Sequence, residues 1–301
     1  MQPPHDAHRS GTAILLDVDG TLVDSNDAHA RAWVDAFAEA GIPVDFDEVR
    51  RAIGMGGDKL MPRVSGLSDE SPEGSRISER RREIFKTRYL PQLRAFPEVR
   101  ALVERLKDDG HMLVVASSAK RDELGALLDR AGVADLIEAR TSSDDAEESK
   151  PDPDIVSAAL RQAGVPARAA VLIGDTPYDV QAGTRAGVRV VAVECGGWRR
   201  QDLAGAAEVY ASPADLHARY ESSLLARLKE EGPADDERPW AAPALMMAFA
   251  FVALGTFMIV RELAGHRPAA PIPDPDAGTP PHAGLGPRER AELRELISRT
   301  S

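Results

Sequence analysis

Cysteine is almost absent from this chain of 301 residues. Its one cysteine, Cys195, has no partner for a disulfide within the chain and excludes a zinc site built from several cysteines. A single cysteine fits a reducing compartment, and it is most often a small buried apolar side chain. Residues 1–11 are polar and lack the apolar stretch of a secretory signal, so we expect no export by that route.

Positive charge is also scarce. Lysine and arginine contribute 37 residues against 49 aspartates and glutamates, which gives a formal net charge of −12 at pH 7. Nonspecific binding to nucleic acid needs a positive surface, so we expect no nucleic-acid partner. Hydrophobic residues make up 43% of the chain and charged residues 29%, a balance that supports a sizeable core in one large domain or two smaller ones.

Short apolar runs alternate with helical patterns from the start of the chain to about residue 193. This alternation predicts an α/β fold, with a Rossmann-like parallel sheet covered by helices on both faces. About 90 residues separate the first strand from the second, too many for one crossover helix. The runs predict strands at 13–17, 111–116, 170–174 and 188–193, core helices at 121–131 and 154–163, and inserted helices at 28–40, 47–53 and 75–89.

The composition divides the chain into further parts. The inserted helices predict a small helical cap domain beside the sheet, and the glycines of residues 54–57 are either a loop that approaches a ligand or an ordinary turn between helices. The predicted organisation is a sheet domain at 1–25 and 97–228, a cap at 26–96, an acidic linker at 229–239, a transmembrane helix at 240–260 and a Pro-rich tail with a short terminal helix at 261–301.

The predicted membrane helix depends on one long apolar run. Residues 239–260 carry no charge over 22 positions, which is long enough to cross a bilayer. Trp240 stands at one end and Arg261 at the other, as interface anchors do. A helix buried in the core or in an oligomer is the alternative, but the run is apolar on all sides. We expect a membrane-anchored protein whose sheet domain stays in the cytoplasm, because that domain lacks an export signal.

Polar residues follow the predicted strands at the edge where ligands bind in open α/β sheets. Asp17 and Asp19 end the first strand two positions apart, a costly place for two negative charges unless a cation or a reaction needs them. The other polar residues at this edge can each be explained singly, as a helix cap or a solvated lysine. Those explanations do not account for the placement of all of them at one edge of the sheet. These others are Ser117, Ser118, Lys150, Asp175 and Asp179.

These residue types together suit phosphoryl transfer. Clustered carboxylates hold Mg²⁺, and a carboxylate beside that ion can attack phosphorus. A second carboxylate can give a proton to the leaving oxygen and later take one from water. A hydroxyl and a lysine stabilise the phosphoryl oxygens in the transition state. Paired carboxylates also serve glycosidases, but those enzymes need no serine and lysine to hold a phosphate.

Residues 17–25, with the sequence DVDGTLVDS, resemble the first motif of the haloacid dehalogenase-like (HAD) hydrolase superfamily. The resemblance is to the subgroup whose helical cap is inserted after this motif, which includes phosphoglycolate phosphatase-like enzymes and β-phosphoglucomutase. It extends over about residues 12–220. The later motifs are matched in order by Ser117, by Lys150, and by Asp175 with Asp179.

The resemblance implies a role for each motif residue. Asp17 would be the nucleophile and a Mg²⁺ ligand, and Asp19 would be the general acid and base with its main-chain carbonyl on the metal. Lys150 would steady the phosphate and the nucleophile. Asp175 would bind Mg²⁺, and Asp179 would support the site through the metal's waters or through Lys150. The phosphate would be bound by Ser117 and Ser118.

The cap would determine which substrate binds, and each of its candidate residues has two readings. His29 lies at the spacing where β-phosphoglucomutase has a histidine that assists proton transfer, although a plain surface position is the alternative. Arg51 and Lys59 flank the glycines of residues 54–57 and either contact a second group of the substrate or are solvated charges. The fourth motif looks more like that of the phosphatases than that of the mutases.

The implied activity is Mg²⁺-dependent hydrolysis of a small phosphorylated metabolite through an aspartyl-phosphate. Three alternatives stay open on the sequence: a phosphosugar mutase, a phosphoprotein phosphatase tethered to the membrane, and a scaffold that retains an inactive HAD domain. The intact set of motif carboxylates and lysine argues against the scaffold.

Removing residues 239–301 tests the predicted anchor. The truncated protein should leave the membrane fraction and keep its phosphatase activity, because the motif residues precede the apolar run. Ultracentrifugation of lysates from cells that express the full chain or the truncated chain measures the distribution. A truncated protein that still pellets with the membranes would contradict the anchor.

Overall fold

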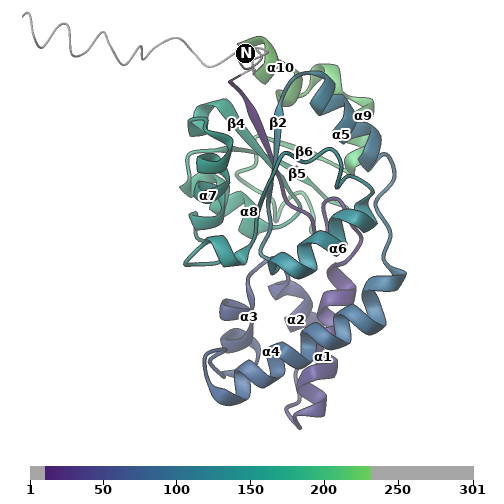
Figure 1. Cartoon of the computed structure of the whole chain (residues 1–301), viewed down its shortest axis with the longest axis vertical. Coiled ribbons are helices and arrows are strands. Elements are labelled where there is room, and N and C mark those ends of the chain that lie inside the picture. Colours follow the sequence, from purple (N-terminus) through teal and green to yellow (C-terminus); the bar gives the residue numbers. More distant parts are fainter. Residues whose placement is uncertain (1–10, 232–301) are drawn as a thin grey trace, which may run out of the picture. The chain divides into compact units, whose positions relative to one another are not determined.

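The computed structural model describes residues 11–231 (Figure 1). Within that stretch, six parallel strands form one sheet in the order β3-β2-β1-β4-β5-β6. The predicted parallel α/β architecture is therefore confirmed. The strands are β1 (Ala13–Leu16), β2 (Met112–Ala116), β3 (Ala139–Thr141), β4 (Ala170–Gly174), β5 (Arg189–Val193) and β6 (Glu208–Tyr210).

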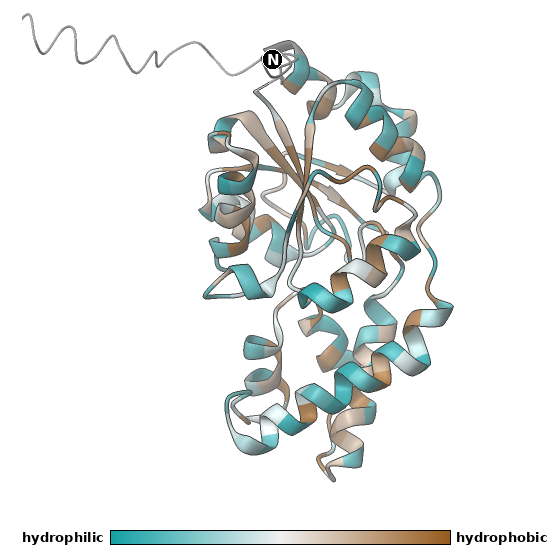
Figure 2. Cartoon of the chain, in the orientation of Figure 1, coloured by the Kyte–Doolittle hydropathy of each residue, from teal (hydrophilic) through white to brown (hydrophobic). Residues whose placement is uncertain are grey.

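Helices cover both faces of the sheet, as predicted (Figure 1). One face packs against α7 (Asp154–Ala163) and α8 (Pro177–Arg185). The other packs against α5 (Val99–Asp108), α6 (Arg121–Ala131), α9 (Pro213–Ala218) and α10 (Leu224–Glu231). Figure 2 shows the apolar strands enclosed by helices whose outward surfaces are polar.

The β1 strand shows why a short unbroken apolar run becomes a central strand. Its four residues are at most 1% exposed. Ile14 and Leu16 belong to the core on one face of the sheet, while Ala13 and Leu15 belong to the core on the other. Successive side chains of a strand point to opposite faces, so a strand covered on both sides needs apolar residues at every position.

The long insertion between β1 and β2 forms a helical layer beside the carboxyl edge of the sheet (Figure 1). Its helices, called the cap here, are α1 (Asn26–Glu39), α2 (Phe46–Ala52), α3 (Gly57–Ser65) and α4 (Pro72–Ile84), followed by a π-helical turn at Phe85–Tyr89 and a 3-10 turn at Leu90–Gln92. The helix predicted over 75–89 is therefore α4 together with the π-helical turn that continues it.

The chain enters and leaves the cap through two segments that pair with each other. Val23 forms an antiparallel bridge with Ala95. Beside it, the backbone N–H of Asp24 donates to the carbonyl of Arg94 at 3.0 Å, and that of Phe96 donates to Leu22 at 3.1 Å. We call these segments the hinge pair. The predicted cap boundaries, 26 and 96, fall next to it.

Two further predictions have different outcomes. The sequence pattern missed β3 and β6, which have three residues each and lie at the two edges of the sheet. The predicted transmembrane helix at 240–260 and the tail at 261–301 lie outside the described residues. Among residues 11–231, no helix has both the length and the apolar character that a membrane crossing requires.

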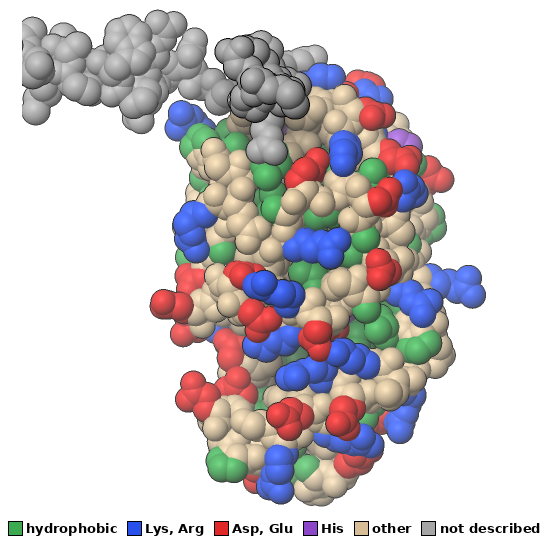
Figure 3. Space-filling view, viewed as in Figure 1, with side chains coloured by type: hydrophobic (Ala, Val, Ile, Leu, Met, Phe, Trp, Pro, Cys, Tyr) green, Lys and Arg blue, Asp and Glu red, His purple; other side chains and the backbone are tan. Residues whose placement is uncertain are grey.

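The surface of the described part carries mixed charge. On the face seen in Figure 3, acidic and basic side chains are interspersed over the cap and the sheet domain, with single apolar side chains between them. Many charged side chains of the described part lie in ion pairs, such as Arg100 with Asp135 at 2.9 Å and Arg88 with Asp35 at 2.6 Å. Exposed pairs of this kind contribute little to stability, so the fold depends on the apolar core.

Candidate active site

The order of the strands places the first and fourth motifs side by side. β1 lies between β2 and β4, and Leu16 pairs with Ile173. The backbone N–H of Asp17 still donates to the carbonyl of Ile173 at 2.9 Å, so the two strands stay paired up to their last residues. Asp17 and Asp175 then emerge together at the carboxyl edge, where the strand order reverses and α/β sheets bind ligands.

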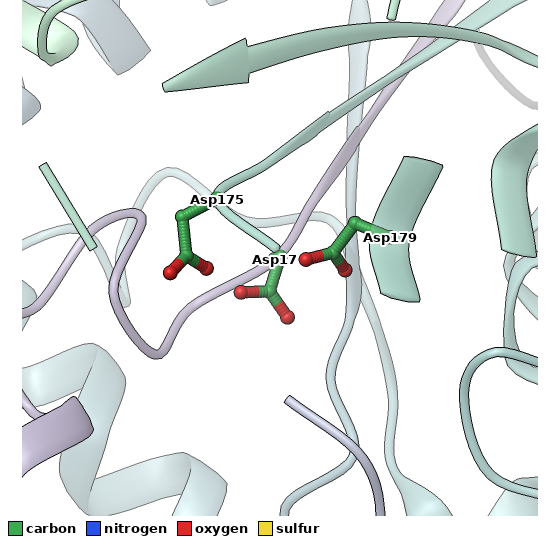
Figure 4. Close-up of side chains that lie close together, drawn as sticks. All are labelled: Asp17, Asp175 and Asp179. Carbon is green, nitrogen blue, oxygen red and sulfur yellow. The ribbon is translucent and has the colours of Figure 1, made fainter. Parts of the chain in front are cut away.

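Three carboxylates converge at this point. One oxygen each from Asp17, Asp175 and Asp179 lies within 4.8 Å of the other two, and Figure 4 shows the side chains turned toward one another. They are 6%, 0% and 1% exposed, respectively. Asp179 is held by the start of α8, where its Oδ2 accepts from the backbone N–H of Thr176 at 3.0 Å and from the Thr176 hydroxyl at 2.6 Å. The capping of α8 thus fixes the third carboxylate.

Lys150 is the cation that contacts this cluster. Its side chain is 1% exposed, and its Nζ lies 2.6 Å from Asp17 Oδ1 and 2.7 Å from Asp179 Oδ1. Burial alone would lower the pKa of Lys150, but the two carboxylates outweigh it and raise the pKa well above the usual range. The lysine is therefore charged at every physiological pH.

One lysine does not balance three buried carboxylates. Burial raises the pKa of Asp17 to about 7, against the attraction of Lys150 and with the help of Asp179 and Asp19. Burial, together with Asp17 and Asp179, also raises the pKa of Asp175 well above its ordinary value. When all three carboxylates are ionised, one lysine leaves an excess of about two negative charges, which a divalent cation such as Mg²⁺ would neutralise, so the donor set fits that ion.

Asp19 lies outside the cluster and has its own partners. Ser25 Oγ donates to Asp19 Oδ1 at 2.5 Å, and His29 Nε2 lies 2.7 Å from the same oxygen. Burial would raise the pKa of Asp19, but His29, Ser25 and Arg81 outweigh it and lower the pKa below the ordinary value. Asp19 is therefore held as a carboxylate that is ready to accept a proton.

The state of His29 follows from its other neighbour. The Arg81 guanidinium hydrogen-bonds to His29 Nδ1. Arginine has no acceptor, so Nδ1 must be unprotonated and the single ring proton sits on Nε2, directed at Asp19. The ring of His29 also stacks on Phe85, with centroids 4.0 Å apart. These contacts hold His29 of the cap in hydrogen-bond contact with Asp19.

A buried ion pair, which the sequence analysis missed, joins the cap to the sheet domain. Arg81 of α4 lies 2.9 Å from Glu123 of α6, and Glu123 is only 2% exposed. We call this pair the cap latch. Neither residue stands in a motif, and no sequence spacing marks them as partners, because their contact exists only when the cap lies against the sheet domain.

The remaining predicted residues divide into two groups. The pocket at the motif carboxylates, which is about 80 Å³, is also lined by Ser118, His29 and Arg81. Ser117 is buried at the end of β2, where its Oγ accepts from the backbone N–H of Ala119 at 3.1 Å. Ser117 does not line this pocket, and neither do Arg51, which is exposed, and Lys59, which pairs with Glu148 and Asp152.

Comparison with known proteins gives a consistent result. The model of the family described as haloacid dehalogenase-like hydrolase matches residues 14–193. The chain is 31% identical over 200 residues to a phosphoglycolate phosphatase of Caulobacter vibrioides, covering 65% of this chain and 84% of that protein. It is 35% identical over 187 residues to protein SUPPRESSOR OF QUENCHING 1, chloroplastic, of Arabidopsis thaliana, covering 61% of this chain but only 18% of that much longer protein.

Solved structures also resemble this fold. A hydrolase from Pseudomonas syringae aligns with a TM-score of 0.65 at 30% identity, over 70% of this chain and 98% of that one. A protein from Bacteroides vulgatus described as a putative beta-phosphoglucomutase aligns with a TM-score of 0.64 at 25% identity, over 72% of this chain and 89% of that one.

Replacing Gly20 by alanine should disrupt the site. Gly20 has a φ of 75°, and a Cβ there would overlap Asn26 Nδ2 and Asp175 Oδ2. Gly41 has a φ of 76° but nothing within 4 Å of the added Cβ, so Gly41→Ala is the matched control. Both variants should lose about 1–2 kcal/mol from left-handed backbone strain. Gly20→Ala alone should also lose about a hundredfold in activity, because Asp175 must move.

Thermal denaturation and phosphate release measure the two effects. Equal activity of Gly20→Ala and Gly41→Ala after correction for the folded fraction would show that the packing around Gly20 does not position the site.

The stabilisation by Mg²⁺ should increase with pH. Without metal, the folded pKa of Asp17 is about 7 and the ordinary value is 3.8, so its proton favours the fold at low pH and this contribution is lost as pH rises through about 7. Mg²⁺ competes with that proton, so it should raise Tm more at about pH 8 than at about pH 5.5. Differential scanning fluorimetry with Mg²⁺, with EDTA, and with NaCl at matched ionic strength checks this, and an equal shift at both pH values contradicts it.

Proposed function

Because the chain belongs to the haloacid dehalogenase-like hydrolase family, we propose that it is a Mg²⁺-dependent phosphatase that acts on a small phosphorylated metabolite through an aspartyl-phosphate. One observation carries the proposal. Asp17 is buried against Lys150 and beside Asp175 and Asp179, an arrangement that positions a carboxylate nucleophile in a site for a divalent cation. Such a buried charge cluster costs stability, which a reaction at the site would explain.

In the first step, an oxygen of Asp17 forms a bond to phosphorus as the bond to the leaving oxygen breaks. Lys150 holds Asp17 Oδ1 at 2.6 Å and Thr21 Oγ1 donates to Oδ2 at 3.2 Å, so the carboxylate has a fixed orientation. A bound Mg²⁺ would supply charge neutralisation at the phosphoryl oxygens, held by Asp17, Asp175 and the main-chain carbonyl of Asp19, with Asp179 in support. Ser117 and Ser118 follow β2 at the same edge and contribute hydroxyl donors.

Proton transfer is assigned to Asp19 and its histidine. Asp19 accepts the proton of a monoanionic phosphate ester and gives it to the leaving oxygen, while the N–H of His29 Nε2, 2.7 Å from Asp19 Oδ1, holds the carboxyl group in place. In the second step, a water molecule attacks phosphorus and gives a proton to Asp19, releasing phosphate and restoring Asp17. The low pKa of Asp19 keeps its carboxylate ionised, so the group is free to take a proton from the water in this step.

A phosphosugar mutase is the second candidate. It is favoured by the His29 to Asp19 contact and by the likeness to the structure described as a putative beta-phosphoglucomutase. A mutase would return an isomeric phosphate ester and require a bisphosphate, whereas a phosphatase releases inorganic phosphate. Phosphate detection and product analysis by ³¹P NMR on the same reaction separate the two.

A phosphoprotein substrate is disfavoured by the cap. The cap latch of Arg81 with Glu123 holds the cap against the sheet domain, and the pocket at Asp17 is about 80 Å³. A folded protein would have to break this buried ion pair to reach the nucleophile. Membrane anchoring through residues 240–260, with the catalytic domain in the cytoplasm, stays a proposal that rests on the sequence alone.

The replacement Asp17→Asn tests the assigned nucleophile. An amide is a poor nucleophile of nearly the same shape, so release of phosphate from p-nitrophenyl phosphate with Mg²⁺ should fall about a thousandfold or more while the protein stays folded. Asp135→Asn makes the same chemical change at an exposed ion pair with Arg100 and should keep full activity. Full activity of Asp17→Asn would remove Asp17 from the mechanism.

A further inference from the structure

A second cavity adjoins the pocket at Asp17. Its volume is about 460 Å³, compared with about 80 Å³ for the inner pocket. The two share Trp33, Gly56, Gly57 and Ser118 in their linings, so they lie next to each other. The inner pocket lies at the nucleophile and is small, so the phosphoryl group belongs there and the rest of the substrate extends into the larger space. We call the larger space the outer cavity.

The outer cavity is rich in unpaired negative charge. Among the described residues, none forms an ion pair with the four carboxylates that line it, whereas Lys120 on its wall lies 3.0 Å from Asp144. Arg82 is the other cation in the lining. The unpaired charges of the cavity therefore sum to a negative value. This negative charge repels an anionic substituent on the substrate. The four carboxylates are Asp58, Asp69, Glu79 and Glu147.

Arg81, which lines the inner pocket, already has partners within the protein. Arg81 binds Glu123 through Nη1, at 2.9 Å from Oε2 and 3.2 Å from Oε1, and hydrogen-bonds to His29 through Nη2. Binding a second anionic group of the substrate would require breaking this buried pair, which leaves the Glu123 carboxylate without its partner. Glu123 and His29 thus occupy both terminal nitrogens of Arg81, so a substrate carboxylate would have to compete with Glu123 for this side chain, of which Nε alone lacks a partner among the described residues.

Hydroxyl groups gather in the same cavity. Ser75, Ser78, Ser118, Ser143 and Ser149 all line it. The Oγ atoms of Ser118 and Ser143 are buried and have no hydrogen-bond partner within the described part of the chain. Buried hydroxyls are normally hydrogen-bonded, and because both residues line the cavity, a rotation of each side chain would let a hydroxylated ligand supply the missing partner. Trp33 adds an apolar surface against which the C–H groups of such a ligand can pack.

We propose that the leaving group of the substrate is polyhydroxylated and carries no negative charge, as in a sugar or polyol phosphate. This inference rests on the proposed phosphatase function and specifies the substrate class of the same site. The serine hydroxyls recognise the leaving group, and the four carboxylates exclude anionic ones. Phosphoglycolate, whose leaving group carries a carboxylate, is then a poor substrate.

A matched pair of substrates tests the charge rule in the full-length protein with Mg²⁺. Sorbitol 6-phosphate and 6-phosphogluconate share a six-carbon chain and differ at one end, a hydroxymethyl group against a carboxylate. We expect kcat/KM for sorbitol 6-phosphate to be higher by about tenfold at low ionic strength, and the ratio to shrink as salt screens the carboxylates. Equal rates, or a preference for 6-phosphogluconate, overturn the proposal.

Paired variants locate the source of the discrimination. The double variant Glu79→Gln/Glu147→Gln removes two carboxylates of the outer cavity and should lower the substrate ratio about threefold. The control Glu83→Gln/Glu148→Gln removes two charges from the same segments outside the cavity, where they pair with Arg80 and Lys59, and should leave the ratio unchanged. An equal change in both double variants would assign the effect to net charge and overturn the role of the cavity.

The hydroxyl contacts are tested separately. Ser143→Ala should lower kcat/KM for sorbitol 6-phosphate several-fold and leave p-nitrophenyl phosphate unaffected, because the nitrophenyl group offers no hydroxyl to Ser143. An equal loss on both substrates would contradict this contact. If none of the phosphate esters is hydrolysed, the proposed function and this inference both fail. If p-nitrophenyl phosphate is hydrolysed in an Asp17-dependent way without the polyol preference, the substrate class alone fails.

Discussion

The excess negative charge at the tips of β1 and β4 is the constraint on which the rest of the site depends. Asp17, Asp175 and Asp179 are buried together, with Lys150 as the cation that touches the cluster. Their positions follow from structural needs, namely the register of two neighbouring strands and the cap of a helix. The fold therefore assembles a charge cluster that is unfavourable by itself and that a bound cation would stabilise.

Local patterns were sufficient for the central elements of the fold. The helices predicted at 121–131 and 154–163 have those bounds in the structure, and three of the predicted strands end at the predicted residue. β3 and β6 were missed because each has only three residues at a sheet edge, too few to form a periodic apolar pattern. The motif residues were found because each follows a buried strand or precedes a helix.

The cap residues show where the sequence is not sufficient. Closeness in sequence to the glycines of residues 54–57 makes Arg51 and Lys59 candidates, but in the structure Arg51 is exposed and Lys59 pairs with Asp152. Arg81 and Glu123, by contrast, carry no motif and meet across 42 positions of the chain. Which face of a cap helix turns toward the sheet domain depends on how two packed layers fit, and that information is spread over many side chains.

The hinge pair has a mechanical consequence. Because Val23 pairs with Ala95, the two crossings of the chain act as a single pivot. Val23 also bridges to Asp19, and its carbonyl accepts from the N–H of Gly20 at 2.8 Å. A rotation of the cap about that pivot would therefore also move Asp19. In the mechanism proposed above, such coupling would bring Asp19 into alignment with Asp17 only when the cap is closed.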